Sequence, residues 1–444
     1  MKRSDYLKPI LLLAFFVVAL TACRKEDWWD YGGKPGHGSH PDSENAMVLF
    51  WNERLETVLS TPMRPPDRGR VFAMVEIAVH DALNNIKPRY KRFALNAQNG
   101  SASKDAAVAS AAYHAIIGLD LTRGFPVQDW YDSVMALIPE GAAKQKGIAL
   151  GQKAAEAIIA NRANDGYTEV ISSSPNPPDG TEPGEYRQTN AVPFRMIPNW
   201  GTVLRPWVLQ SNYQFRPAGP YAVTSREYAI DFNEVKKKGA RVGSNRTPHE
   251  EKLAQFWADN RISVLWNQFA RKAIANRKMD AWETARYFAV LHTALADGFN
   301  TALESKYHFY YWRPETAIKE AANDGNPKTE PDLNWVPFVI ETVQPTPPGN
   351  WVSPPIPEYP SSYAMAGGVA TEVIKQLLGT DRITIDMTSD LLPGVTIRYN
   401  SLSQAARDNS LAKIYAGWYF RKAVLDGEDM GRKIASYVVK NGFK

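Results

Sequence analysis

The chain has 444 residues, of which 44% are hydrophobic and 22% are charged, and its formal net charge is +5. This composition is that of a folded globular protein and excludes disorder over most of the length. The small net charge argues against a nucleic-acid partner, and no run of Lys or Arg residues suggests a groove for a polyanion. The single cysteine, Cys23, excludes an intramolecular disulfide and a zinc site built from several thiolates.

Residues 1–22 have the pattern of a lipoprotein signal peptide. A positively charged start precedes an apolar run, residues 10–20, that is too short to span a bilayer. The sequence Leu-Thr-Ala-Cys follows and resembles a bacterial lipobox, in which Cys23 is lipidated and becomes the mature N-terminus. Several acyl chains on one residue would anchor the protein firmly. We therefore expect a lipid-anchored protein of the bacterial cell envelope, in the outer membrane, with residues 23–45 as a flexible tether. Residues 24–27 (Arg-Lys-Glu-Asp) also resemble the surface-export signal of some lipoproteins.

From residue 46 the hydrophobic pattern predicts helices and no long strand. Over 71–86, for example, apolar residues recur with the helical period of about 3.6 residues. Thr247, Pro248 and Glu250 have the sequence of a capping box, and the helix that they begin is expected to extend to about residue 275. The expected helices are 47–59, 71–86, 104–121, 126–137, 142–163, 225–238, 247–275 and 280–303.

Three short segments in the C-terminal third carry residue types that suit anion binding. Lys306 and Arg313 are about two helical turns apart, so both side chains can face one pocket. Two converging cations attract an oxyanion, and arginine suits bidentate contact. Ser361 follows a proline-rich stretch at the start of a predicted helix, where its hydroxyl can cap and free N–H groups can hold an anion. Lys413, in a helix near the end of the chain, adds a third cation. Taken separately, these residues could also be surface charges and a helix cap.

Together the segments resemble the motifs of the superfamily of vanadium-dependent haloperoxidases and type-2 phosphatidic acid phosphatases. These motifs are Lys-x6-Arg-Pro, Pro-Ser-Gly-His and Ser-Arg-x5-His. The first motif is intact in this chain, and the second reads Pro-Ser-Ser-Tyr. The third aligns as Lys-x5-Tyr, with lysine at the position of the motif's arginine and tyrosine at the position of its histidine. The resemblance covers roughly residues 46–440. The residues at the motif positions are Lys306, Arg313, Pro314, Ser361, Ser362, Tyr363, Lys413 and Tyr419.

The resemblance implies an all-α fold of two packed helical bundles around one buried pocket. The N-terminal bundle is expected over 46–240 and the C-terminal bundle, which carries the motifs, over 241–444. Within the first, residues 166–221 are rich in Pro, Gly and Asn and are expected to be irregular. The family also implies a small oxyanion or phosphate ester as ligand, with vanadate as the candidate cofactor and no metal site built from protein side chains.

Both positions at which the family has catalytic histidines are tyrosine in this chain. In the family one histidine is a general acid/base, and the other ligates vanadate or attacks phosphorus; Tyr363 and Tyr419 take these positions. Imidazole titrates near neutral pH, whereas a phenol with a pKa of about 10 stays protonated and is a poor base. We therefore expect phosphate or vanadate binding through Lys306, Arg313 and Ser361, with catalysis lost or altered. The remaining motif residues, Ser362 and Lys413, are expected to lie in the same oxyanion site.

Two alternatives stay open. One is an active haloperoxidase or acid phosphatase with a non-standard site, in which Tyr419 is an activated nucleophile. The other is a structural or adhesion lipoprotein that has kept only the helical bundles. Other histidines are expected to be structural, although His292 and His308 flank the first motif and are the nearest candidates for pocket neighbours. Glu76 and His80, four residues apart, could hold a metal or pair with each other.

Overall fold

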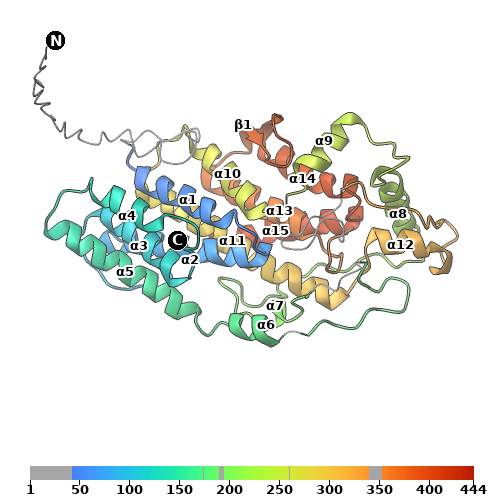
Figure 1. Cartoon of the computed structure of the whole chain (residues 1–444), viewed down its shortest axis with the longest axis horizontal. Coiled ribbons are helices and arrows are strands. Elements are labelled where there is room, and N and C mark those ends of the chain that lie inside the picture. The colour runs from blue at the N-terminus through green and yellow to red at the C-terminus, as the bar shows by residue number, and fades with distance from the viewer. Residues whose placement is uncertain (1–42, 174, 190–194, 260, 340–352) are drawn as a thin grey trace, which may run out of the picture. The chain divides into compact units, whose positions relative to one another are not determined.

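Helices dominate the part of the chain that the computed structural model describes, which is residues 43–173, 175–189, 195–259, 261–339 and 353–444 (Figure 1). The predicted signal peptide, Cys23 and most of the tether lie outside these residues. Within them, the strands are confined to one two-stranded hairpin, so the predicted all-helical class is confirmed. No described helix is both long enough and apolar enough to cross a membrane.

Among the first five helices, α2 packs against both α3 and α5. Their bounds are α1 (Ala46–Leu59), α2 (Pro65–Ile86), α3 (Lys104–Gly118), α4 (Val127–Met135) and α5 (Ala142–Arg162). The prediction that helix α2 begins at residue 71 was wrong. It begins at Pro65, because proline is favoured in a first helical turn, and Asp67 there complements the helix dipole.

The segment 166–221 is irregular as predicted, apart from the short helices α6 (Tyr167–Ser173) and α7 (Trp200–Val203). Its apolar anchor is Trp200, which packs in a buried cluster with Leu303 and donates a hydrogen bond of 2.8 Å to Asn300 Oδ1.

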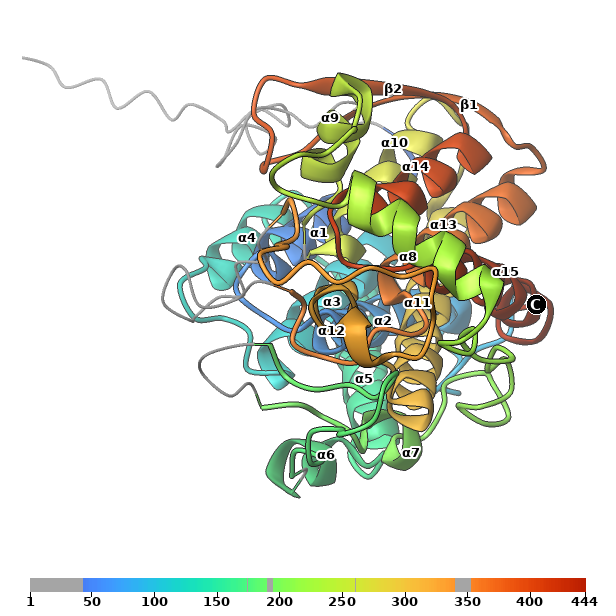
Figure 2. The same ribbon diagram turned by 90° about the vertical axis from the view of Figure 1, so that its right-hand side faces the viewer.

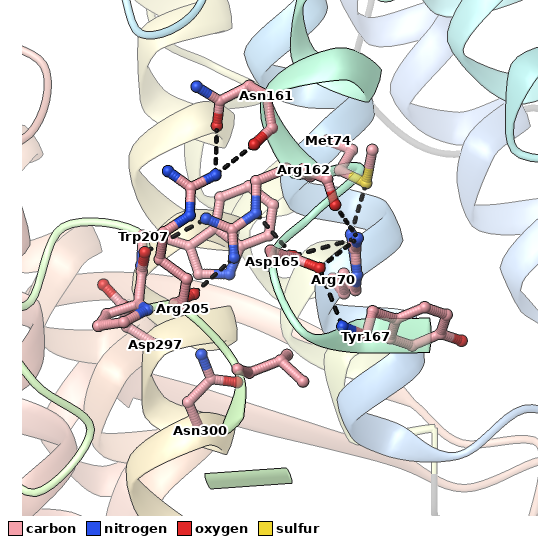
Figure 3. A network of polar contacts seen from close by, with 12 residues as sticks. Arg70, Met74, Asn161, Arg162, Asp165, Tyr167, Arg205, Trp207, Asp297 and Asn300 are labelled. Atoms are coloured by element: carbon pink, nitrogen blue, oxygen red, sulfur yellow. Dashed lines mark hydrogen bonds and ion pairs between the residues drawn. The ribbon is translucent and has the colours of Figure 1, made fainter. Parts of the chain in front are cut away.

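A buried polar network also fixes this segment to the helices (Figure 3). The Asp165 carboxylate accepts from Arg162 Nε at 2.8 Å and from Arg70 Nη2 at 3.2 Å. The Asp297 carboxylate accepts three successive main-chain N–H groups of residues 207–209, at 2.7, 2.8 and 3.1 Å. The Arg162 guanidinium lies over the Trp207 ring, 4.0 Å from its centroid. Buried charges with such partners substitute for the regular hydrogen bonds that the segment lacks.

The helix predicted from residue 247 to about 275 is two helices, α9 (Pro248–Phe256) and α10 (Ile262–Ile274). The capping box of Thr247 and Glu250 is confirmed. The break follows from Asp259, whose carboxylate accepts the main-chain N–H of Arg261 at 2.7 Å. Such a local side-chain bond competes with helix continuation. The preceding helix, α8 (Arg226–Lys238), agrees with the prediction to one residue.

The long helix α11 (Ala281–Phe309) is central to the fold and places the first motif. It packs against α2 from the N-terminal half and against α13 and α15 from the C-terminal half. It ends at Tyr310, whose backbone is left-handed with φ 46°. Arg313 then caps α12 (Pro314–Glu320), which the short 3-10 helix η1 (Ala321–Asn323) follows. The expectation that Lys306 and Arg313 lie two turns apart on one helix was therefore wrong.

The remaining elements carry the second and third motifs. The helices are α13 (Ser362–Leu378), α14 (Leu402–Tyr415) and α15 (Arg421–Asn441). An antiparallel hairpin of β1 (Arg382–Thr388) and β2 (Thr396–Ser401), which the sequence analysis did not predict, lies against α10 and α14 (Figures 1 and 2). Because α11 packs on elements of both halves, the boundary between two bundles at residue 240 stays a prediction.

Candidate functional site

The two cations of the first motif converge although they belong to different helices. Lys306, in the last turn of α11, is fully buried, and its Nζ donates to the carbonyl oxygens of Pro357 at 2.8 Å and Glu358 at 2.7 Å. Arg313, at the start of α12, is also fully buried. It donates to the carbonyl oxygens of Ile356 at 2.8 Å, Trp418 at 3.0 Å and Pro357 at 3.3 Å. Both cations therefore hold the main chain that leads into the second motif.

A buried carboxylate, Glu358, accompanies this cationic pair. Its Oε1 accepts the main-chain N–H of Phe420 at 2.8 Å, and its Oε2 has no hydrogen-bond partner among the described residues. Burial raises the pKa of Glu358 to about 8, against the opposing effect of the charges on Arg313 and Lys306. Burial, reinforced by Arg313, holds the pKa of Lys306 well below its usual range. The sequence analysis assigned no role to Glu358. The feature that could have indicated one is its position as the single acidic residue in the proline-rich stretch before Ser361.

Each motif cation lies on the face of a tyrosine ring. Lys306 Nζ is 5.1 Å and Arg313 Cζ is 4.5 Å from the ring centroid of Tyr419. Lys413 Nζ lies 4.3 Å from the ring centroid of Tyr363. The two tyrosine rings meet edge to face, with 6.4 Å between their centroids. The negative face of an aromatic ring attracts a cation, so the tyrosines are electrostatic partners of all three cations.

The second motif starts helix α13 as predicted. Ser361 is the N-cap residue, and its buried hydroxyl accepts the main-chain N–H of Ala364 at 3.2 Å. Ser362, the first residue of the helix, is partly buried. The third-motif residue Lys413 is buried on α14. It donates to the carbonyl oxygen of Trp257, the residue that follows α9.

A cavity of about 880 Å³ lies beside the motif residues. Of these, Ser362, Tyr363 and Tyr419 line it, whereas Lys306, Arg313, Ser361 and Lys413 do not. The structure thus brings the three motifs together beside the cavity. The two tyrosines that line it are also the residues whose rings contact the cations.

The histidines singled out in the sequence lie outside this site. His292 is buried, its Nε2 donates a 2.9 Å hydrogen bond to Asn267 Oδ1, and its ring stacks on Phe72. Burial lowers the pKa of His292 to about 3. No histidine is among the described residues that line the cavity. The distance from His308 Nε2 to Arg216 Nη1 is 3.4 Å.

Glu76 and His80 do not pair with each other. Glu76 accepts from Asn52, and His80 contacts Asp81. Within the described ranges, no group of three or more His, Cys, Asp or Glu residues could hold a metal ion.

The helical fold and the convergence of the three motifs agree with the predicted resemblance to vanadium haloperoxidases. Residues 286–443 match the family described as the VCPO second helical-bundle domain. The vanadium chloroperoxidase of Curvularia inaequalis is 23% identical to this chain over an alignment that covers 80% of the chain and 71% of that protein. These matches support the assignment of the chain to the vanadium haloperoxidase superfamily, as the motifs predicted.

Two solved structures show that the fold is shared. The first bacterial vanadium-dependent iodoperoxidase aligns with a TM-score of 0.74 and 20% identity, over 89% of this chain and 96% of that one. A holo-type bacterial vanadium-dependent chloroperoxidase aligns with a TM-score of 0.66 and 17% identity, over 90% and 97%.

Proposed function

We propose that this protein is a lipoprotein of the cell envelope whose haloperoxidase fold binds a ligand without oxidising halides. The observation that carries the proposal is that Tyr363 and Tyr419 line the cavity and contact the motif cations, which do not line it. A phenol is a poor base at neutral pH, and no described cavity-lining residue is a histidine that could replace it.

The residues present fit vanadate poorly. Lys306 and Arg313 together donate five hydrogen bonds to main-chain carbonyl oxygens, and the Tyr419 ring contacts both cations. Binding of phosphate or vanadate through Lys306, Arg313 and Ser361, as the motifs predict, would require this ring to leave both cations. It would also require an oxyanion to compete with buried hydrogen bonds.

Titration with orthovanadate and with inorganic phosphate, alongside halide oxidation by peroxide, tests the proposal. We expect no binding heat and no turnover from the wild-type protein. The Tyr363→His/Tyr419→His variant is expected to gain vanadate binding. Imidazole supplies a nitrogen ligand, and its ring is smaller than a phenol and leaves more room beside the cations. Tyr113→His/Tyr131→His, at a stacked tyrosine pair away from the cavity, is the matched control.

Several outcomes contradict the proposal. Vanadate-dependent iodide or bromide oxidation by the wild-type protein would show that the tyrosines permit the family reaction. Phosphatase turnover that Tyr419→Phe abolishes would instead establish a tyrosine nucleophile. A double histidine variant that binds no vanadate would show that the two tyrosines are not what keeps vanadate out.

A further inference from the structure

The cavity in front of the tyrosine pair has the size and wall of a site for a small organic molecule. Its volume of about 880 Å³ falls within the range of roughly 300–1,000 Å³ that is common for ligand sites. Apolar and aromatic residues form much of the wall, among them Ile262, Phe299, Leu303 and Trp418. Such a wall favours an apolar, preferably aromatic, ligand body.

Positively charged residues outnumber negatively charged ones on the cavity wall. Among the described residues that line the cavity, the charged ones are three arginines and two aspartates: Arg64, Arg68, Arg261, Asp67 and Asp259. Both aspartates have several donors. The Asp67 carboxylate accepts from Arg64 Nε at 2.5 Å, from Arg64 Nη2 at 3.3 Å and from the Tyr167 hydroxyl at 2.9 Å. The Asp259 carboxylate accepts from the main-chain N–H of Arg261 at 2.7 Å and from its Nη2 at 2.6 Å.

These pairs leave donors unused on two arginines. Arg64 binds Asp67 through Nε and Nη2, and Arg261 binds Asp259 and Asp390 through the same two nitrogens. Neither Nη1 has a partner among the described residues. The two side chains are only 33% and 21% exposed, so both arginines are partly buried. Arginines in this state are suited to bind a carboxylate or phosphate.

We propose that the cavity binds an amphipathic organic anion. Its apolar body lies against the aromatic wall and the tyrosine pair, and its anionic group lies at Arg64 and Arg261. The inference rests on the proposed function, since Tyr363 and Tyr419 form part of the same wall. It goes further by naming the ligand class and by assigning recognition to two arginines that lie outside the three motifs.

Three naphthalene probes of similar shape separate the contributions of charge and apolar body. Calorimetric titration of the full chain is made with 2-naphthoate, 2-naphthyl phosphate and neutral 2-naphthamide. We expect at least one of the anions to bind about tenfold or more tightly than the amide, the effect of a charge-assisted hydrogen bond in a partly desolvated site. The anion that binds more tightly identifies the carboxylate or the phosphate ester as the preferred group. Acetate and inorganic phosphate, which lack the apolar body, are expected to give no heat.

Two variants locate the site. Arg64→Ala and Arg261→Ala are each expected to weaken anion binding about tenfold and to leave the affinity for the amide unchanged. Arg187→Ala is the matched control, because Arg187 has a similar exposure of 23%, pairs with Glu320 and does not line the cavity.

Equal affinity for the anions and the amide, or no binding of any probe, overturns the inference without requiring any variant to fold. Anion binding that is unchanged in both folded arginine variants also overturns it. Vanadate-dependent halide oxidation would contradict the proposed function and leave the comparison of the probes intact.

Discussion

Tyr419 changes what a pair of buried cations can do. Lys306 and Arg313 keep their charge-bearing groups within 5.1 Å of its ring centroid, and desolvated cation–π contacts contribute about 2 kcal/mol each. Glu358 supplies a carboxylate in the same buried region, and its pKa reflects both cations. The cations are thus stabilised by groups of the chain itself. At this scale the substitution of two histidines alters the electrostatic partners of the site as well as its proton-transfer groups.

Lys306 is expected to be a major contributor to stability. Lys306→Met removes the donor of two buried main-chain carbonyl oxygens and leaves Glu358 with one cation fewer. We expect a loss of about 3–5 kcal/mol in the free energy of unfolding, measured by urea denaturation. Lys433→Met, at an exposed pair with Asp429, is the control and should cost less than about 1 kcal/mol. Equal small losses in both variants would contradict the structural role of Lys306.

Glu76 is expected to make stability depend on pH. It is buried on α2, accepts a 2.9 Å hydrogen bond from Asn52, and burial raises its pKa to about 7 from 4.5. The folded state therefore binds this proton more tightly than the unfolded state does. The resulting stabilisation is full below pH 4.5 and is lost as the pH rises through 7.

Glu76→Gln is expected to remove this pH dependence, which amounts to about 3 kcal/mol between pH 4 and pH 8. Unfolding free energies at several pH values, compared between the variant and the wild-type protein, measure it. Glu156→Gln, at an exposed position of α5, is the control. An unchanged slope in Glu76→Gln would show that the carboxyl has no raised pKa in the folded state.

At the scale of elements, polar groups fix the segments that hydrophobic periodicity does not. Asp297 lies on α11, yet its carboxylate binds three consecutive N–H groups of the irregular segment near residue 207. Asp165 joins two arginines from α2 and α5. These contacts set where the irregular segment runs across the helices (Figure 3).

Asp165→Ala is expected to loosen this segment. The change leaves the buried Arg162 and Arg70 without their shared carboxylate, and we expect a loss of about 3–5 kcal/mol in unfolding free energy. Faster limited proteolysis within 175–189 and 195–221 should accompany it, because local opening exposes the backbone. Asp429→Ala is the control, since Asp429 is 50% exposed and pairs with Lys433 on the surface of α15. Cleavage at the wild-type rate would assign the fixing of the segment to other contacts.

At the scale of the whole molecule, one helix links the site to the rest of the fold. The packing of α11 against α2, α13 and α15 sets the position of Lys306 at its C-terminal end. The second and third motifs then reach that end from α13 and from the turn after α14. A substitution that shifts these helices would therefore move the tyrosines relative to the cations.

Attachment to the membrane through Cys23 is predicted to determine where the whole protein is located. Cys23→Ser removes the thiol that lipidation requires, so we expect the protein to leave the membrane fraction and to lose incorporation of labelled fatty acid. The control is Ser39→Ala, in the predicted tether. Membrane association that persists in Cys23→Ser would point to a different mode of attachment.

Much of the helical fold was predictable because helix signals are local. Apolar spacing, the Thr247 capping box and the proline-rich irregular segment depend only on neighbouring residues. The errors arose where a side chain overrode that pattern. Asp259 divided one predicted helix, and the left-handed Tyr310 separated Lys306 from Arg313. The hairpin was missed because only Ile385, Met387 and Tyr399 of its two strands are buried, so the apolar alternation that marks them in the sequence is short.

By itself, the sequence predicted the resemblance to the superfamily, the residues at the motif positions and the tyrosines at the two positions where the family has histidines. The tertiary structure alone decided that both tyrosines line the cavity and contact the cations, which are bound to main-chain carbonyl oxygens. It also decided that Glu358 joins the cations and that Arg64 and Arg261 line the cavity. These arrangements depend on contacts between residues far apart in the chain, and motif spacing carries no information about which face of a packed helix a distant ring will cover.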